Sequence, residues 1–148
     1  MSYVEDLFSL KGKRAVVTGA KRGLGNCIAK SLYDSGAEVL GIDKLDFSDE
    51  EFETYTCNIE DKKDIDGLIE YCKTKWSKID ILINNAGVGF AHSLLDYPLE
   101  DWETTYKVNL LAPFLLTQGL APLLIENGGG SVINITSLNA EQAFPGNP

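Results

Sequence analysis

Apolar runs rich in β-branched residues recur along the chain, and longer segments with helical spacing separate them. Five runs predict strands: Ala15–Thr18, Glu38–Ile42, Phe52–Cys57, Ile79–Ile83 and Ser131–Thr136. Three segments predict helices: Gly25–Ser35, Asp61–Trp76 and Leu99–Asn127. Except in Phe52–Cys57, the strand runs do not alternate cleanly between apolar and polar positions, which is typical of a parallel sheet buried on both faces. The sequence therefore predicts an α/β fold with a doubly wound parallel sheet.

Glycine and proline residues indicate where the helices end. Gly36 ends the first helix, while Pro113 and Pro122 are expected to kink or divide the long third one. No internal repeat or low-complexity linker interrupts the pattern, so residues 1–148 are interpreted as a single domain. After Thr136 no further helix is predicted. Because a parallel sheet needs helices on both faces, we expect a fold truncated after its fifth strand, with an apolar edge that favours self-association.

Composition and charge exclude several classes of protein. The 148 residues carry 13 basic and 22 acidic side chains, a net charge of −9, and no basic cluster of the kind that a nucleic acid needs. No uninterrupted apolar stretch approaches the roughly 18 residues of a membrane-spanning helix, and the first residues lack the order of a signal peptide. The three cysteines are widely spaced and lack metal-ligand spacing. We therefore expect no metal site, no membrane segment and a cytoplasmic location.

The turn Thr18-Gly-Ala-Lys-Arg-Gly-Leu-Gly25 stands between the first strand and the first helix. Gly19 would let the chain turn sharply off the strand, Gly23 would let the backbone approach a pyrophosphate, and Gly25 would let helix and sheet pack closely. Free N–H groups at the start of the helix would then face the anion. This context predicts a dinucleotide site. A glycine-rich turn that binds nothing is the alternative.

Asp43 lies 18 residues after Gly25, at the end of the second strand. A carboxylate there can accept hydrogen bonds from both ribose hydroxyls of an adenosine and repels a 2′-phosphate, so NAD is favoured over NADP as the cofactor. Lys21, Arg22 and Lys44 weaken that preference, because a cation can bind a phosphate. The alternative is an acid that merely ends a strand.

Four ordered motifs carry a resemblance to a known family. They are the turn Thr18–Gly25, Asn84-Asn-Ala-Gly87 after the fourth strand, Asn109 in Lys-Val-Asn-Leu-Leu, and Ser137 at the end of Val-Ile-Asn-Ile-Thr-Ser. Over nearly its whole length the chain resembles the short-chain dehydrogenase/reductase family, whose fold is Rossmann-like. The resemblance assigns cofactor contacts to Thr18, Gly19, Lys21, Arg22, Gly23, Leu24, Gly25, Asp43, Asn58, Ile59, Asn85, Ala86 and Gly87. Asn58 stands where the family has an acid that holds the adenine.

The resemblance implies hydride transfer between a nicotinamide cofactor and a small alcohol or carbonyl substrate. Ser137 would donate a hydrogen bond to the substrate oxygen, and Asn109 would bend its helix and hold a water molecule. The family's tyrosine and lysine, in a Tyr-x-x-x-Lys pattern, follow about a dozen residues after the serine, and only eleven residues follow Ser137. Residues 1–148 are therefore expected to turn over slowly or not at all.

Several aromatic and histidine side chains admit a structural interpretation. The single Tyr-x-x-x-Lys, Tyr71 to Lys75, lies on the helix before the fourth strand, and we interpret Tyr71 as a helix surface residue. His92 is interpreted as a solvated loop residue, with a substrate contact as the alternative. Trp102 and Tyr106, four residues apart, are expected in the core or in a subunit contact. In the family the corresponding helix often packs against its copy, so a homo-oligomer is expected.

Two functions of different kinds remain open at this point. One is an oxidoreductase of the family's type. The other is a non-catalytic dinucleotide-binding module, or one half of a two-chain enzyme whose partner supplies the remaining elements. Both need the dinucleotide site, and they differ in whether residues 1–148 can support turnover.

Overall fold

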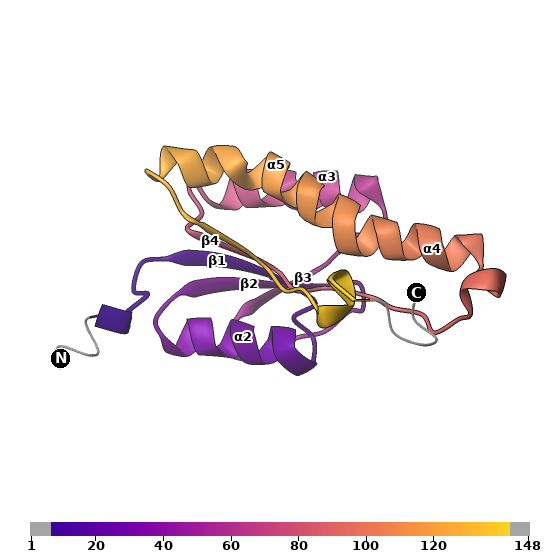
Figure 1. The fold of residues 1–148 in the computed structure, drawn as a ribbon. Helices are drawn as coiled ribbons and strands as arrows, with labels where there is room; N and C mark the ends of the chain where they lie inside the picture. The colour runs from indigo at the N-terminus through magenta and orange to yellow at the C-terminus, as the bar shows by residue number, and fades with distance from the viewer. Residues whose placement is uncertain (1–6, 143–148) are drawn as a thin grey trace.

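The computed structural model describes residues 7–142 and contains a parallel five-stranded sheet (Figure 1). The strands are β1 (Arg14–Thr18), β2 (Glu38–Asp43), β3 (Glu53–Thr56), β4 (Ile81–Asn84) and β5 (Ser131–Asn134). Their order is β3-β2-β1-β4-β5, and every neighbouring pair is parallel. The chain therefore builds the sheet outward from β1 to β3, then reverses and adds β4 and β5 on the other side. The predicted α/β fold is confirmed.

Helices cover both faces of this sheet. The main ones within residues 7–142 are α2 (Gly23–Asp34), α3 (Lys62–Lys75), α4 (Leu99–Tyr106) and α5 (Ala112–Glu126). Figure 1 shows α2 on one face and α3, α4 and α5 on the other. This division follows from right-handed crossovers between parallel strands. The crossover from β1 to β2 runs in one direction along the sheet, and those from β3 to β4 and from β4 to β5 run in the opposite direction, so their helices lie on opposite faces. No helix separates β2 from β3, as the short connection predicts.

The long helical segment bends at one of its two prolines. A π-helical turn, η2 (Lys107–Leu111), separates α4 from α5, and Pro113 lies in the first turn of α5. Pro122, in contrast, lies inside α5 without dividing it, since the core contacts on either side of it hold the helix. Asn109 lies within the π-helical turn, and its role in bending the helix stays a prediction. Such turns are frequent at functional sites.

The stretch Leu99–Glu126 is, by length and composition, long and apolar enough to cross a membrane. In this fold it lies on the sheet, and the buried side chains of α5 join the core shared with α3. Gly119 permits this close contact, because a Cβ there would lie 2.2 Å from Ile69 Cδ1 of α3. The α5 part of the stretch therefore serves as a core helix, whereas α4 has no buried residue.

β5 forms one side of the sheet and is exposed along its length. Val132, Ile133 and Ile135 keep 38%, 46% and 39% of their surface accessible. Within the described residues its only strand partner is β4. The expectation of an apolar, uncovered last strand is confirmed for residues 7–142. Self-association through it stays a prediction.

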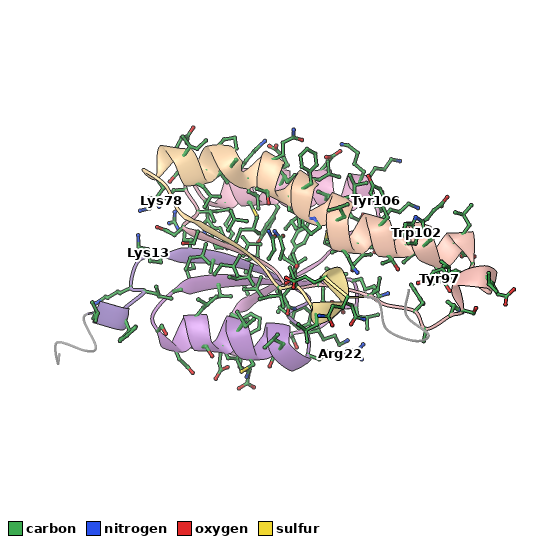
Figure 2. The ribbon with its side chains drawn as sticks, viewed as in Figure 1. Lys13, Arg22, Lys78, Tyr97, Trp102 and Tyr106 are labelled. Carbon is green, nitrogen blue, oxygen red and sulfur yellow. The ribbon has the colours of Figure 1, made fainter. Side chains whose placement is uncertain are left out.

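Buried Asp80 ties three segments together at the amino ends of the strands. Its carboxylate accepts hydrogen bonds from Lys13 Nζ (2.8 Å), Arg14 N (3.0 Å) and Asn127 Nδ2 (2.5 Å). Burial alone would raise the pKa of Asp80, but these bonds hold it below its ordinary value. Figure 2 shows Lys13 at the end of the molecule opposite Arg22. With the amino ends of β1 and β4 fixed here, their carboxyl ends emerge side by side near Arg22.

Candidate functional site

The turn between β1 and α2 has the geometry that its glycines predict. Gly19 and Gly23 have φ angles of +69° and +60°, a conformation that other residues rarely adopt. Gly25 lies against the turn: a Cβ there would stand 2.1 Å from the Gly19 carbonyl oxygen and 2.4 Å from Asn85 Nδ2. No side chain caps α2 and its first turn has no acidic residue. The start of the helix therefore keeps N–H groups available for an anion.

Thr18 connects this turn by hydrogen bonds to the segment that follows β4. Its Oγ1 accepts hydrogen bonds from Asn85 N (3.1 Å) and Ala86 N (3.0 Å). Asn85 Nδ2 donates in return to the carbonyl oxygens of Thr18 (2.9 Å) and Gly19 (3.4 Å). β1 and β4 are the neighbours between which the direction of chain building reverses. These hydrogen bonds therefore lie at the topological switch point, where open α/β sheets bind ligands.

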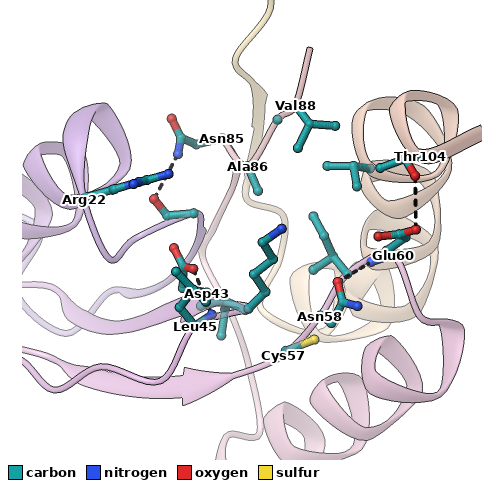
Figure 3. Close-up of a pocket in the computed structure, with 16 residues that line it drawn as sticks. Arg22, Asp43, Leu45, Cys57, Asn58, Glu60, Asn85, Ala86, Val88 and Thr104 are labelled. Carbon is teal, nitrogen blue, oxygen red and sulfur yellow. Dashed lines mark hydrogen bonds between the residues drawn. The ribbon is translucent and has the colours of Figure 1, made fainter. Parts of the chain in front are cut away.

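A hollow of about 280 Å³ opens at these strand ends (Figure 3). Eight of the predicted cofactor contacts line it: Gly19, Arg22, Asp43, Asn58, Ile59, Asn85, Ala86 and Gly87. Five others do not belong to its lining: Thr18, Lys21, Gly23, Leu24 and Gly25. Of these, Thr18 and Gly25 are buried behind the hollow, where they shape it from within. The predicted cofactor contacts thus include both residues that line the hollow and buried residues that pack behind its lining.

The hollow also has lining residues that the sequence did not single out as cofactor contacts: Ile42, Lys44, Leu45, Cys57, Glu60, Val88, Thr104 and Val108. Most of them adjoin a predicted contact in sequence, and that adjacency is the signal that could have found them. Thr104 and Val108 come from the helical stretch that begins with α4, which carries no cofactor motif. Thr104 Oγ1 donates to Glu60 Oε1 (3.3 Å), which connects this stretch to the turn after β3 (Figure 3).

Asp43 faces the hollow with both carboxylate oxygens already in use. Oδ2 accepts a hydrogen bond from Lys21 N (3.2 Å), and Oδ1 accepts one from Leu45 N (3.1 Å). This is the pattern of an acid that ends a strand. It is also compatible with binding, because each carboxylate oxygen can accept a second hydrogen bond. The Asp43 carboxylate can therefore both end the strand and accept hydrogen bonds from a ribose, the two alternatives that the sequence left open.

The far wall of the hollow follows β3. Asn58 N donates to Asp64 Oδ2 (2.9 Å), and Asn58 Oδ1 accepts from Glu60 N (3.3 Å), so the turn after β3 is fixed. Burial raises the pKa of the neighbouring Cys57 thiol to about 12. That thiol is therefore neutral and serves as an apolar part of the wall.

Asn109 and Ser137 lie outside the lining of the hollow, near the carboxyl ends of β4 and β5. Asn109 Oδ1 accepts from Val88 N (2.9 Å) and its Nδ2 donates to Val88 O (2.8 Å), so it holds the segment after β4. Ser137 follows β5, is exposed, and accepts a hydrogen bond from Asn139 N (3.3 Å). The bond from Ile135 N to the Asn84 carbonyl (2.9 Å) brings these two strand ends together.

Comparison with known proteins identifies the family. The profile of the short chain dehydrogenase family matches residues 13–148. The chain belongs to this family. The 2-dehydro-3-deoxy-D-gluconate 5-dehydrogenase of Bacillus subtilis (strain 168) is 36% identical, over 93% of this chain and 58% of the relative. The gluconate 5-dehydrogenase of Gluconobacter oxydans (strain 621H) is also 36% identical, over 95% and 59%. Both relatives are named as dehydrogenases.

Solved structures of the short-chain dehydrogenase type share the fold. A putative NAD(P)-dependent gluconate 5-dehydrogenase from Beutenbergia cavernae, with bound NADP at low occupancy, superimposes with a TM-score of 0.88 at 27% identity, over 95% of this chain and 60% of that one. The NADPH-dependent 3-quinuclidinone reductase from Rhodotorula rubra gives 0.87 at 29% identity, over 97% and 59%. This chain therefore spans about three-fifths of the length of these relatives. The names of these two proteins mention NADP or NADPH, and the preference for NAD over NADP that the sequence indicates stays a prediction.

The only Tyr-x-x-x-Lys of the chain lies far from the family's site. Tyr71 donates to Glu53, at the amino end of β3, and Lys75 pairs with the same carboxylate. The hydrogen bond to Glu53, with burial, raises the pKa of Tyr71, whereas a proton-transferring tyrosine needs a lowered one. Tyr71 is partly exposed on α3, and its ring packs against Tyr55 with ring centroids 4.8 Å apart, which agrees with its interpretation as a helix surface residue.

Two interpretations need correction. His92 is half-buried and its Nε2 lies 2.7 Å from Asp101 Oδ2, so it is a paired residue that joins the loop after β4 to α4. Trp102 and Tyr106 are 60% and 49% exposed, which excludes the core as their place and leaves the subunit contact as a prediction. Within residues 7–142 no three potential ligands come together as a metal site would require.

Proposed function

We propose that this chain forms the dinucleotide-binding part of an NAD(P)-dependent oxidoreductase that transfers a hydride between a nicotinamide cofactor and an alcohol or carbonyl substrate. The observation that carries the proposal is the hollow at the switch point, with the glycine turn on one side and Asp43 on another. The names of the gluconate-related relatives support a polyhydroxylated sugar acid as the substrate class.

The residues present fit a dinucleotide. The uncapped start of α2 and the two glycines with positive φ offer backbone N–H groups to a pyrophosphate. Asp43 offers the adenosine ribose two acceptor oxygens, and Arg22 and Lys44 add positive charge to the same lining. We propose NAD as the preferred cofactor, with NADP accommodated through these two cations. The nicotinamide, when bound, supplies or takes up the hydride.

In this proposal Ser137 donates a hydrogen bond from Oγ to the substrate oxygen. Asn109 holds Val88 and with it the segment that leads from the cofactor to the substrate side. Moving the proton needs a tyrosine of lowered pKa, and the one Tyr-x-x-x-Lys of residues 1–148 is engaged with Glu53. Residues 1–148 therefore bind cofactor without supporting normal turnover.

Titration with NADH and NADPH, followed by tryptophan fluorescence, tests the site. We expect tighter binding of NADH than of NADPH, and no turnover of the bound cofactor with sugar acids, polyols or 3-oxoacyl thioesters. Asp43→Asn should reverse the preference, because it removes the charge that repels the 2′-phosphate and weakens acceptance from the ribose hydroxyls. A change of about tenfold in the affinity ratio is expected for one charged hydrogen bond.

Asp34→Asn is the matched control, because Asp34 is exposed at the end of α2 and outside the lining. It should leave the NADH-to-NADPH ratio unchanged. Absence of binding by both dinucleotides would refute the proposed function. Turnover at the rate of an ordinary family member would show that the catalytic groups have been misplaced.

The alternative function is a non-catalytic dinucleotide module, or one half of a two-chain enzyme. The exposed apolar strand β5 and the engaged Tyr71 favour it. Cofactor binding without turnover agrees with both versions. Turnover that appears only after a second polypeptide is added would establish the two-chain version.

We propose that the protein is a homo-oligomer. Five exposed apolar residues follow one another at helical spacing on α4, η2 and α5: Leu99, Trp102, Tyr106, Leu110 and Phe114, each 49–69% accessible. Figure 2 shows Trp102 and Tyr106 along this helix. Phe114→Glu should shift the mass measured by light scattering toward the monomer, whereas Tyr33→Glu, on the other face of the sheet, should not.

We also propose a cytoplasmic location. Cys27, Cys57 and Cys72 are all free thiols. Free thiols are typical of a reducing compartment, where glutathione and thioredoxin keep cysteines reduced.

A further inference from the structure

Lys21 differs from the other charged residues around the hollow, because both of its polar groups are directed to the loop after β2. Its backbone N–H donates to Asp43 Oδ2 (3.2 Å), and its Nζ donates to the Asp46 carbonyl oxygen (2.9 Å). It does not line the hollow. We propose that Lys21 is a positioning residue that fixes the phosphate-binding turn to the ribose-binding carboxylate, an inference that rests on the proposed dinucleotide function.

The loop that receives Lys21 is itself held by β3. The Asp43 carbonyl accepts from Cys57 N (2.8 Å), Asp46 Oδ1 accepts from Thr56 Oγ1 (3.3 Å), and the Phe47 carbonyl accepts from Thr54 Oγ1 (2.9 Å). Three bonds therefore fix the loop to the sheet without any help from the turn. The Lys21 side chain adds a bond between the turn and this loop, beside two bonds from main-chain N–H groups of the turn: Ala20 N to the Ile42 carbonyl (2.9 Å) and Lys21 N to Asp43 Oδ2 (3.2 Å).

Two consequences follow for the cofactor. The Asp43 carboxylate is oriented from both sides, by Lys21 N and Leu45 N, before a ligand arrives. Such preorganisation strengthens recognition, because no ordering is needed on binding. The Lys21 ammonium already donates to Asp46, so the cations left in the lining are Arg22 and Lys44. The Lys21 side chain thus acts on the ribose contact by holding the turn whose main-chain N–H orients Asp43, rather than by binding a phosphate.

Amide hydrogen exchange without cofactor tests the tether itself. In Lys21→Met the amides of the turn, residues 20–23, should exchange at least about tenfold faster than in the unmodified chain, since the side-chain bond that ties the turn to the fixed loop is lost. Lys73→Met removes the same charge from an exposed position on α3 and should leave these amides unchanged. Equal exchange in Lys21→Met and the unmodified chain would overturn the proposal.

Binding then separates positioning from direct contact. The probes are NADH and its analogue with 2′-deoxyadenosine. Lys21→Met should lose most of the preference for NADH over the analogue, about tenfold, while the affinity for the analogue stays the same. Equal weakening of both would make Lys21 a phosphate ligand and overturn the proposal. If the unmodified chain binds neither probe, the proposed function fails. The exchange experiment still decides whether the Lys21 side chain ties the turn to the loop after β2.

Discussion

Gly25→Ala is expected to abolish measurable dinucleotide binding and to destabilise the fold. A Cβ at this position would lie 2.1 Å from the Gly19 carbonyl oxygen and 2.4 Å from Asn85 Nδ2. Neither atom can move freely, because Asn85 Nδ2 donates to the Thr18 carbonyl and Gly19 forms the turn itself. Relief of the overlap must push α2 away from the turn. We expect a loss of about 1–3 kcal/mol in the free energy of unfolding, as for an overpacked core.

Gly89→Ala is the control for this substitution. Gly89 has no atom within 4 Å of an added Cβ and no positive φ, and it lies in the loop after β4 outside the lining of the hollow. Chemical denaturation and NADH titration of the two variants give the comparison. If Gly25→Ala bound NADH as tightly as Gly89→Ala, close packing at Gly25 would not be what shapes the site.

Sequence reasoning locates the parts of the site that depend on local geometry. The strand, the glycine turn and the following helix are consecutive, and Gly19, Gly23 and Gly25 are needed for reasons that involve few neighbours. Asp43 follows from its place at the end of β2. The order of the strands also follows, since alternating strands and helices with right-handed crossovers leave few topologies. These features were therefore predictable.

The features that sequence reasoning missed depend on contacts between distant segments. Thr104 lines the hollow together with Glu60, which is 44 positions away. Lys21 carries a charge that suggests a phosphate ligand, and only the position of the Asp46 carbonyl shows that it is already bonded. For Trp102 the sequence leaves the core and a subunit contact open, because helical spacing alone does not say which face of a helix meets the sheet. Tertiary packing decides each of these cases.

Thr18→Val is the second substitution with a large expected effect. Thr18 Oγ1 accepts hydrogen bonds from Asn85 N and Ala86 N in a place where the side chain is 1% exposed. Valine has the same shape but no acceptor, so both N–H groups lose their partner. At about 1–3 kcal/mol for each of the two unsatisfied groups, the free energy of unfolding should fall by about 2–6 kcal/mol. NADH affinity should fall too, because Asn85 and Ala86 line the hollow.

Thr18→Ser separates the hydroxyl from the methyl group of the same side chain. Serine keeps the acceptor and removes a single buried methyl, which should lower the free energy of unfolding by about 1 kcal/mol and leave NADH binding nearly intact. Urea denaturation of the two variants, read by far-ultraviolet circular dichroism, measures the difference. If serine proved as destabilising as valine, the methyl contact would contribute as much as the hydroxyl, and the hydroxyl would not be the main link between β1 and the segment after β4. The expected large difference in unfolding free energy between the two variants would instead identify the Thr18 hydroxyl oxygen as the main link between β1 and the segment after β4.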